Sequence, residues 1–145
     1  MGQLEAAATV LWTGWAGTVT GESGALTAPT ATQLELGGPG GGTNPEELLA
    51  AAHANCFTST LTSLARARAV PLDEVSTSVT TRLAWDDETH DHHLASSTLS
   101  LRIVSAAEEG SVRDLVREVE ERCPVCRALS GNVPMTVSLE VGRPD

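Results

Sequence analysis

The order of predicted segments indicates an α+β fold with a mostly antiparallel sheet. Strand-like stretches occur near both ends of the chain and twice in its second half, helical signals lie between them, and no regular strand–helix–strand repeat is visible. The chain has 145 residues, which is a usual size for one domain, and no linker divides it. We therefore expect a single domain over residues 1–145.

The first part of the chain predicts three strands and a loop. Residues 4–23 alternate in the manner of two strands separated by a turn at Trp15–Gly17. A third short strand is expected around Thr32–Leu36. The glycine-rich run at 37–42 cannot hold regular structure and predicts a loop.

A strong helix signal follows the glycine-rich run. Asn44 supplies an N-cap oxygen, Pro45 suits the first helical position, and two glutamates complement the positive end of the helix dipole. The helix should run to about Arg68, because Pro71 ends it. Its apolar residues are spread around the helical wheel, which predicts a long, buried central helix.

The second half of the chain predicts a hairpin, a second helix and a last strand. Residues 76–85 and 94–104 have strand patterns and enclose a polar turn. Ser111 is the expected cap of an amphipathic helix, which Pro124 interrupts so that a short new helical turn begins there. Residues 133–141 provide the last strand.

Composition excludes several classes of protein. The net charge is −10 with no lysine, so a nucleic-acid partner is not expected. The longest uncharged stretch, residues 48–65, is too polar to span a membrane, and no export signal is visible. Three cysteines in such a chain favour reduced thiols in the cytoplasm over a disulfide framework. We expect a cytoplasmic protein without a cofactor.

Cys123 and Cys126 are candidate reactive thiols. With Pro124 at the first helical position, Cys123 becomes an N-cap, where free backbone N–H groups favour a negatively charged sulfur. Cys126 completes a C-x-x-C spacing, which is typical of thiol–disulfide exchange sites and also of half a zinc site. The alternative for each cysteine is a small apolar residue packed in the core.

Two motifs resemble those of the OsmC/Ohr family of bacterial thiol proteins. Residues 43–48 read TNPEEL and lead through AAAHAN to Cys56 and Phe57, as in the first active-cysteine motif of that family. The CPV run that begins at Cys123, with RAL after it at 127–129, resembles the second motif of that family. The strand and hairpin pattern extends this resemblance over nearly the whole chain, closer to the OsmC branch.

The resemblance implies an OsmC-like fold, an intertwined homodimer and a thiol-dependent peroxidase active in oxidative or osmotic stress defence. Its substrates would be organic hydroperoxides, with hydrogen peroxide as a possible second substrate. Cys56 would attack the peroxide and form a sulfenic acid, and Cys123 would then form a disulfide with Cys56. A lipoyl or thioredoxin-like dithiol would restore both thiols. Cys126 is an alternative resolving thiol or an acceptor of the disulfide.

The resemblance also gives roles to polar residues, with one departure. Glu46 matches the family's active-site carboxylate, although a simple helix-dipole role is the alternative. Ten helical residues separate Glu46 from Cys56 by about 15 Å, so we expect Glu46 to serve the partner subunit's site or to act through an intermediary. The family's upstream arginine is missing; Gln33 stands near its place, and Arg127 is a second candidate, or else a solvated charge.

Other functions stay open from the sequence. A relative without enzymatic activity would keep the thiols but bind an apolar ligand or sense oxidants. A zinc protein would use Cys123, Cys126 and either Cys56 or histidines. The histidines and carboxylates at residues 86–93 are also metal ligands by type, but polar residues are expected at a hairpin tip. His53, three positions before Cys56, is expected to line the core or a pocket.

Overall fold

The computed structural model describes residues 1–145, which form two compact units, Met1–Leu48 and Leu49–Asp145. The expectation of one domain stays a prediction. The elements in chain order are β1 (Ala8–Thr13), β2 (Ala16–Gly21), β3 (Thr27–Ala31), the 3-10 helix η1 (Leu34–Leu36), α1 (Pro45–Ala67), β4 (Glu74–Trp85), β5 (His92–Val104), α2 (Glu109–Arg122), α3 (Pro124–Leu129) and β6 (Met135–Gly142).

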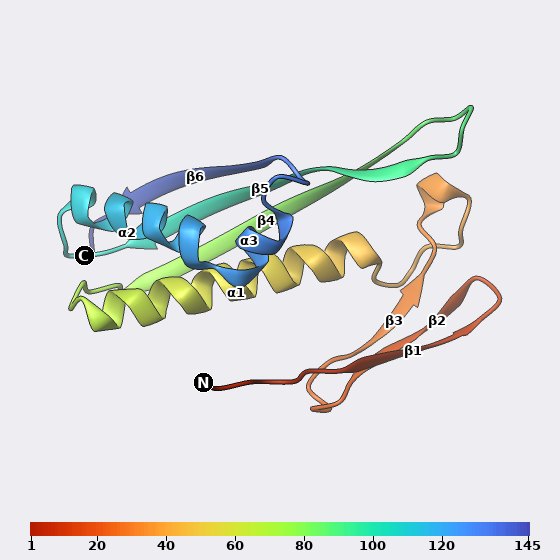
Figure 1. Ribbon diagram of the computed structural model, residues 1–145, viewed down its shortest axis with the longest axis horizontal. Helices are drawn as coiled ribbons and strands as arrows, with labels where there is room; N and C mark the ends of the chain where they lie inside the picture. The colour runs from red at the N-terminus through yellow and green to blue at the C-terminus, as the bar shows by residue number, and fades with distance from the viewer. The chain divides into compact units, whose positions relative to one another are not determined.

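The first unit contains a three-stranded antiparallel sheet in the order β1-β2-β3 (Figure 1). The predicted first two strands are confirmed, but the turn between them lies at Gly14 and Trp15, because Ala16 and Gly17 already pair with β1. The predicted third strand is wrong, because Thr27–Ala31 forms β3 and Leu34–Leu36 forms η1. Pro29 argues against a strand in the sequence. The strand forms nevertheless, because β3 lies at the edge of its sheet, where proline is tolerated. Gly37 closes η1 in a left-handed conformation with φ 78°, and its N–H donates to the Leu34 carbonyl.

The second unit contains a three-stranded sheet in the order β4-β5-β6. β4 and β5 form the predicted antiparallel hairpin, with a register shift between Arg82 and Leu83. β6 pairs with β5 in parallel, from Ser97↔Met135 to Val104↔Gly142. Three of the four strand pairs in the chain are antiparallel, so the predicted α+β class with mostly antiparallel sheet is confirmed.

One face of this second sheet carries the core. Apolar side chains of β5 pack with those of α1, α2 and α3, and Figure 1 shows these helices running beside the sheet. The buried members are Phe57, Leu61, Ala65, Leu99, Leu101, Ile103, Val112, Leu115, Val116, Val119, Cys123 and Cys126. Alternate β5 residues such as Ser100 and Arg102 are exposed, so the opposite face is polar.

Helix α1 begins as the sequence predicts. The Glu47 N–H donates a 2.8 Å hydrogen bond to Asn44 Oδ1, which confirms Asn44 as a capping side chain, and Pro45 is the first helical residue. The helix ends at Ala67, one residue before the predicted end. No helix of the chain has the length and apolar character that crossing a bilayer requires.

Helix α1 is less buried in the single chain than predicted. Its buried residues are His53, Phe57, Leu61 and Ala65, which recur every fourth position and so form one stripe. Its opposite side is exposed and consists largely of alanine, serine and threonine. Alanine is small enough to be exposed at little cost. Alanines spread around the helical wheel therefore do not require burial on all sides, and the predicted burial of the whole helix was too extensive.

The start of α2 also differs from the expectation. The helix begins at Glu109 with Glu108 as the N-cap, so Ser111 lies inside its first turn and does not cap it. Its predicted apolar stripe is buried, and Cys123 ends it. Arg68, just after α1, and Arg122, at the end of α2, both form ion pairs with Glu118.

Candidate active site

Three thiols meet at the break between α2 and α3. Cys56 comes from α1, Cys123 lies between the two later helices, and Cys126 lies in α3. All three are free thiols; Cys123 and Cys126 are buried, and Cys56 is partly exposed. The Cys123 thiol is close enough to Cys56 and Cys126 to raise the pKa of both. The structure thus brings together the two predicted catalytic cysteines and the third thiol.

The helix break places these sulfurs for a local reason. Cys123 is the N-cap of α3 in an extended conformation, and Pro124 takes the first helical position, as predicted. The next two backbone N–H groups have no carbonyl partner within the helix. The Val125 N–H donates to the Cys56 sulfur, and the Cys126 N–H donates to Cys123 Sγ at 3.5 Å.

Burial dominates the acidity of Cys56. It raises the pKa of the Cys56 thiol above its ordinary value, and the neighbouring Cys123 thiol raises it further. A hydrogen bond from the Val125 N–H lowers the pKa without cancelling the rise, while the Thr60 hydroxyl donates to the Cys56 carbonyl at 2.9 Å. No arginine contributes to the pKa of Cys56 within the chain. A neutral thiol is therefore its main form at neutral pH in the single chain.

His53 and Ser97 form a buried polar pair beside Cys126. His53 Nε2 lies 3.1 Å from Cys126 Sγ, and His53 Nδ1 lies 2.9 Å from Ser97 Oγ. Burial lowers the pKa of His53 and raises that of Cys126 to about 12, with neighbouring thiols and Glu120 adding to the latter. The expectation that His53 lines the core is confirmed, but its contact is with Cys126. Ser97 carried no signal in the sequence, since β5 contains several serines.

Gln33 and Glu46 are joined within the first unit. The Gln33 side-chain amide donates a 2.6 Å hydrogen bond to the Glu46 carboxylate. Gln33 is the N-cap residue of η1 and does not belong to a strand, while Glu46 lies in the first turn of α1. The residue at the expected place of the family's arginine therefore contacts the expected carboxylate, with an amide in place of a cation.

Arg127 is the second candidate for the missing cation. It is exposed in the last turn of α3, and it lines a cavity of 420 Å³ together with Cys126. It is not among the groups that change the pKa of Cys56 or Cys126. A solvated charge describes this arrangement best.

The metal alternatives gain no geometric support. No group of three or more His, Cys, Asp or Glu side chains is arranged to hold a metal ion. The hairpin tip has a structural explanation, because Asp86 accepts backbone hydrogen bonds from Glu88 and Thr89 and thereby forms the turn. These hydrogen bonds lower the pKa of Asp86.

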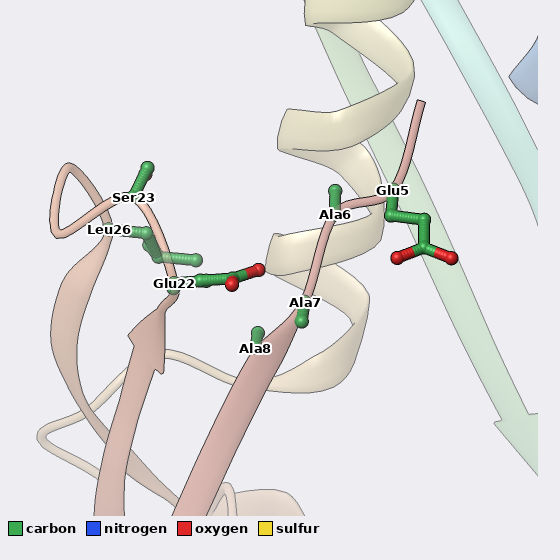
Figure 2. Close-up of a pocket in the computed structure, with 8 residues that line it drawn as sticks. Glu5, Ala6, Ala7, Ala8, Glu22, Ser23 and Leu26 are labelled. Carbon is green, nitrogen blue, oxygen red and sulfur yellow. The ribbon is translucent and has the colours of Figure 1, made fainter. Parts of the chain in front are cut away.

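A hollow at one end of the first sheet has a different character from the thiol cluster. It is a 560 Å³ space lined by the ends of β1 and β2 and the residues beside them, including Glu5, Glu22 and Leu26. Figure 2 shows Glu22 reaching across it toward the segment of Ala6 and Ala7. It contains no thiol, imidazole or arginine, and all three cysteines lie in the second unit.

The thiol cluster lies within the part of the chain that matches a known protein family. The chain matches the OsmC-like protein family over residues 38–138, which include Cys56, Cys123 and Cys126. The chain belongs to the OsmC-like protein family. This family membership confirms the resemblance that the two cysteine motifs carry.

Similar OsmC-like proteins are named for hydroperoxide resistance. The chain is 35% identical over 114 residues to the organic hydroperoxide resistance protein OhrA of Bacillus subtilis strain 168, covering 77% of this chain and 73% of that protein. It is 33% identical over 118 residues to the organic hydroperoxide resistance protein of Xanthomonas axonopodis pv. citri, covering 79% and 80%.

Solved structures of OsmC-like proteins share the fold. The organic hydroperoxide resistance protein OsmC of Legionella pneumophila matches with a TM-score of 0.80 and 30% identity, covering 97% of this chain and all of that chain. OhrB of Bacillus subtilis matches with a TM-score of 0.76 and 26% identity, covering 94% and 98%. Both OsmC and Ohr names occur among these proteins, so placement nearer the OsmC branch stays a prediction.

Proposed function

We propose that this OsmC-like protein is a cytoplasmic thiol peroxidase that reduces organic hydroperoxides, and hydrogen peroxide as a further substrate, in oxidative or osmotic stress defence. The observation that carries the proposal is the closeness of Cys56 and Cys123: Cys56 packs against the core that contains Cys123, and the Cys123 thiol raises the pKa of Cys56. It places a nucleophile within reach of a second thiol that can capture its oxidised form. The hydroperoxide-resistance names of the similar proteins support the substrate class.

The reaction begins at Cys56. Its thiolate attacks the terminal peroxide oxygen, the O–O bond breaks, and the alkoxide leaves as an alcohol after taking a proton. Cys56 is thereby oxidised to a sulfenic acid. Partial exposure makes Cys56 the accessible member of the cluster, and the Val125 N–H is placed to stabilise its thiolate.

Cys123 completes the oxidation. Its thiolate attacks the sulfenic sulfur of Cys56, a disulfide forms, and water leaves with the sulfenic oxygen. A dithiol of the lipoyl or thioredoxin-like class then reduces the protein by two exchange steps and becomes a disulfide itself. Two electrons pass from the dithiol to the hydroperoxide in each cycle.

The active unit in this proposal is a homodimer. All six residues of β1 are exposed, and Val10, Leu11 and Trp12 are 54%, 74% and 43% exposed, next to Trp15 at 63%. Large apolar side chains gathered in this way are typical of a protein–protein interface. The Gln33–Glu46 pair would serve the partner subunit's thiols, because ten residues of α1 keep Glu46 from Cys56 of its own chain.

Dithiol-dependent turnover tests the proposed function. We expect wild type to consume an organic hydroperoxide in the presence of dithiothreitol, Cys56→Ser to have lost this activity, and Ser63→Ala to retain it. Ser63 is a matched control because it is exposed on the same helix. Absence of turnover in the wild type would contradict the proposal and favour the ligand-binding or oxidant-sensing alternative.

A further inference from the structure

Cys123 is the neighbour that Cys56 and Cys126 share. Cys123 Sγ accepts from the Cys126 N–H at 3.5 Å, Cys56 packs against the core that contains Cys123, and the Cys123 thiol raises the pKa of both other cysteines. Thiol–disulfide exchange requires one sulfur to approach another directly. Cys123, which adjoins both of the other thiols, is therefore the one that can exchange with either neighbour.

Cys126 also has a proton acceptor that the Cys56–Cys123 reaction does not use. His53 is fully buried, and its Nε2 lies 3.1 Å from Cys126 Sγ. If Nδ1 carries the proton and donates to Ser97 Oγ at 2.9 Å, Nε2 is free to accept from the thiol. The arrangement of serine, imidazole and thiol is that of a nucleophile with an oriented base.

We propose that Cys126 is a third redox thiol, which takes over the disulfide from Cys56 and leaves the oxidised protein with a Cys123–Cys126 bond and a free Cys56. This inference rests on the proposed peroxidase function, which supplies the Cys56–Cys123 disulfide. His53 is the base that activates Cys126, and Ser97 is a positioning residue that fixes the orientation of the imidazole.

The transfer is balanced without a further oxidant or reductant. Cys126 gives its thiol proton to His53 Nε2, and the thiolate attacks the Cys123 sulfur. The Cys123–Cys126 bond forms while the Cys56–Cys123 bond breaks. His53 then releases the proton to solvent and the leaving Cys56 thiolate takes one up, so the protein contains one disulfide and the same number of protons before and after. The external dithiol then reduces the Cys123–Cys126 disulfide.

The transfer moves the disulfide to a sulfur that borders a cavity. Cys126 borders the 420 Å³ cavity, whereas Cys56 and Cys123 are not among the cavity's lining residues. Leu99, Met135 and Val137 form the apolar part of its lining, and Glu120, Glu121 and Arg127 are charged. The transferred disulfide thus has one sulfur at a cavity that Cys56 does not line.

Hydroperoxide stoichiometry without a reductant tests the inference. A freed Cys56 can attack again, so we expect wild type to consume two equivalents of hydroperoxide per chain before it stops. Cys126→Ser, which keeps the size and a hydroxyl donor, should stop after one equivalent. Consumption of a single equivalent by both proteins would overturn the relay and leave the proposed function standing. No consumption by either would overturn both.

Disulfide mapping gives a second readout. After one equivalent of hydroperoxide, peptides of the wild type should show a Cys123–Cys126 bond and an alkylatable Cys56, whereas Cys126→Ser should show Cys56–Cys123. A Cys56–Cys123 bond as the end product in the wild type would contradict the transfer.

A pH profile tests the role of His53. With His53→Gln, we expect uptake of the second equivalent to slow by about a hundredfold or more, the usual effect of losing a general base. The remaining rate should rise about tenfold per pH unit between pH 7 and 9, because the thiolate fraction of Cys126 grows in that proportion below its pKa of about 12. The titratable groups around that thiol are His53, Cys123, Cys56 and Glu120. A loss that is the same at every pH would contradict the proposed base.

Discussion

The Gln33 amide donates a 2.6 Å hydrogen bond to the Glu46 carboxylate, at the place where the family resemblance leads one to expect an arginine. An amide provides a donor without a charge, and charge-assisted hydrogen bonds are roughly twice as strong as neutral ones. The pair therefore keeps the geometry of the expected site and loses its cation.

Gln33→Arg should restore the cation and accelerate the peroxidase. A guanidinium held by Glu46 would stabilise the attacking thiolate, and we expect kcat/KM for an organic hydroperoxide to rise about tenfold, a change worth about 1.4 kcal/mol. Steady-state kinetics check this value. Gln33→Leu is the matched control without a donor and should be slower than wild type. Equal rates for all three proteins would show that Gln33 does not serve the site.

The rate of hydroperoxide attack should rise with pH above neutrality in the wild type. Burial raises the pKa of Cys56, and the attacking species is the thiolate. Below its pKa, the thiolate fraction increases about tenfold per pH unit, so the single-turnover rate should do the same. A rate that is already constant between pH 6 and about 8 would contradict the raised pKa, since thiols usually titrate near 8.5.

Alkaline pH should destabilise the folded protein through Cys126. Its pKa rises from 9.0 in the unfolded reference to about 12 in the folded chain, so the folded state holds this proton more tightly. The stabilisation is complete below pH 9 and is lost as the pH rises toward 12, by up to about 1.4 kcal/mol per pH unit. Urea unfolding at several pH values measures this loss. Cys126→Ser should show a shallower dependence, and an identical slope would contradict the assignment.

Leu11→Glu should break the dimer. Leu11 is 74% exposed in the single chain and lies among other exposed apolar residues of β1, so a carboxylate there would be buried unpaired in a dimer interface. Light scattering should give twice the mass of one chain for wild type and one chain's mass for the variant. Glu5→Gln, outside β1, is the control. A monomeric wild type would contradict the proposed dimer.

Leu61→Ala should destabilise the core under the thiol cluster. Leu61 is fully buried in the stripe of α1, and such truncations cost about 2–5 kcal/mol. Ser63→Ala, on the exposed side of the same helix, should change the free energy of unfolding by less than about 0.5 kcal/mol. Urea unfolding compares the two, and a similar effect of both would show that α1 packs differently.

Local chemistry made much of the fold predictable. Asn44 and Pro45 fix the start of α1, and Cys123 with Pro124 fixes the start of α3, because caps and proline act within one turn. The third strand was misplaced because its pairing partner, β2, decides where it forms, and Pro29 argues against a strand. Tertiary pairing overrides local preference in such cases.

The candidate site was predictable only in part. Motif resemblance singled out Cys56 and Cys123, and the structure brings their thiols together. The contact between His53 and Cys126 spans 73 residues and depends on how α3 packs against α1, so no local pattern reports it. Ser97 could not be predicted for the same reason, because its contact with His53 also joins residues that are distant in the sequence.

The most direct test of the central claim is chemical trapping of the oxidised Cys56. In Cys123→Ser the sulfenic acid has lost its capturing thiol, so it should accumulate after one equivalent of an organic hydroperoxide. Labelling with a sulfenic-acid-selective dione and peptide mass spectrometry should then find the label on Cys56. A label confined to Cys126, with Cys56 still a free alkylatable thiol after the hydroperoxide has been consumed, would contradict Cys56 as the peroxidatic thiol.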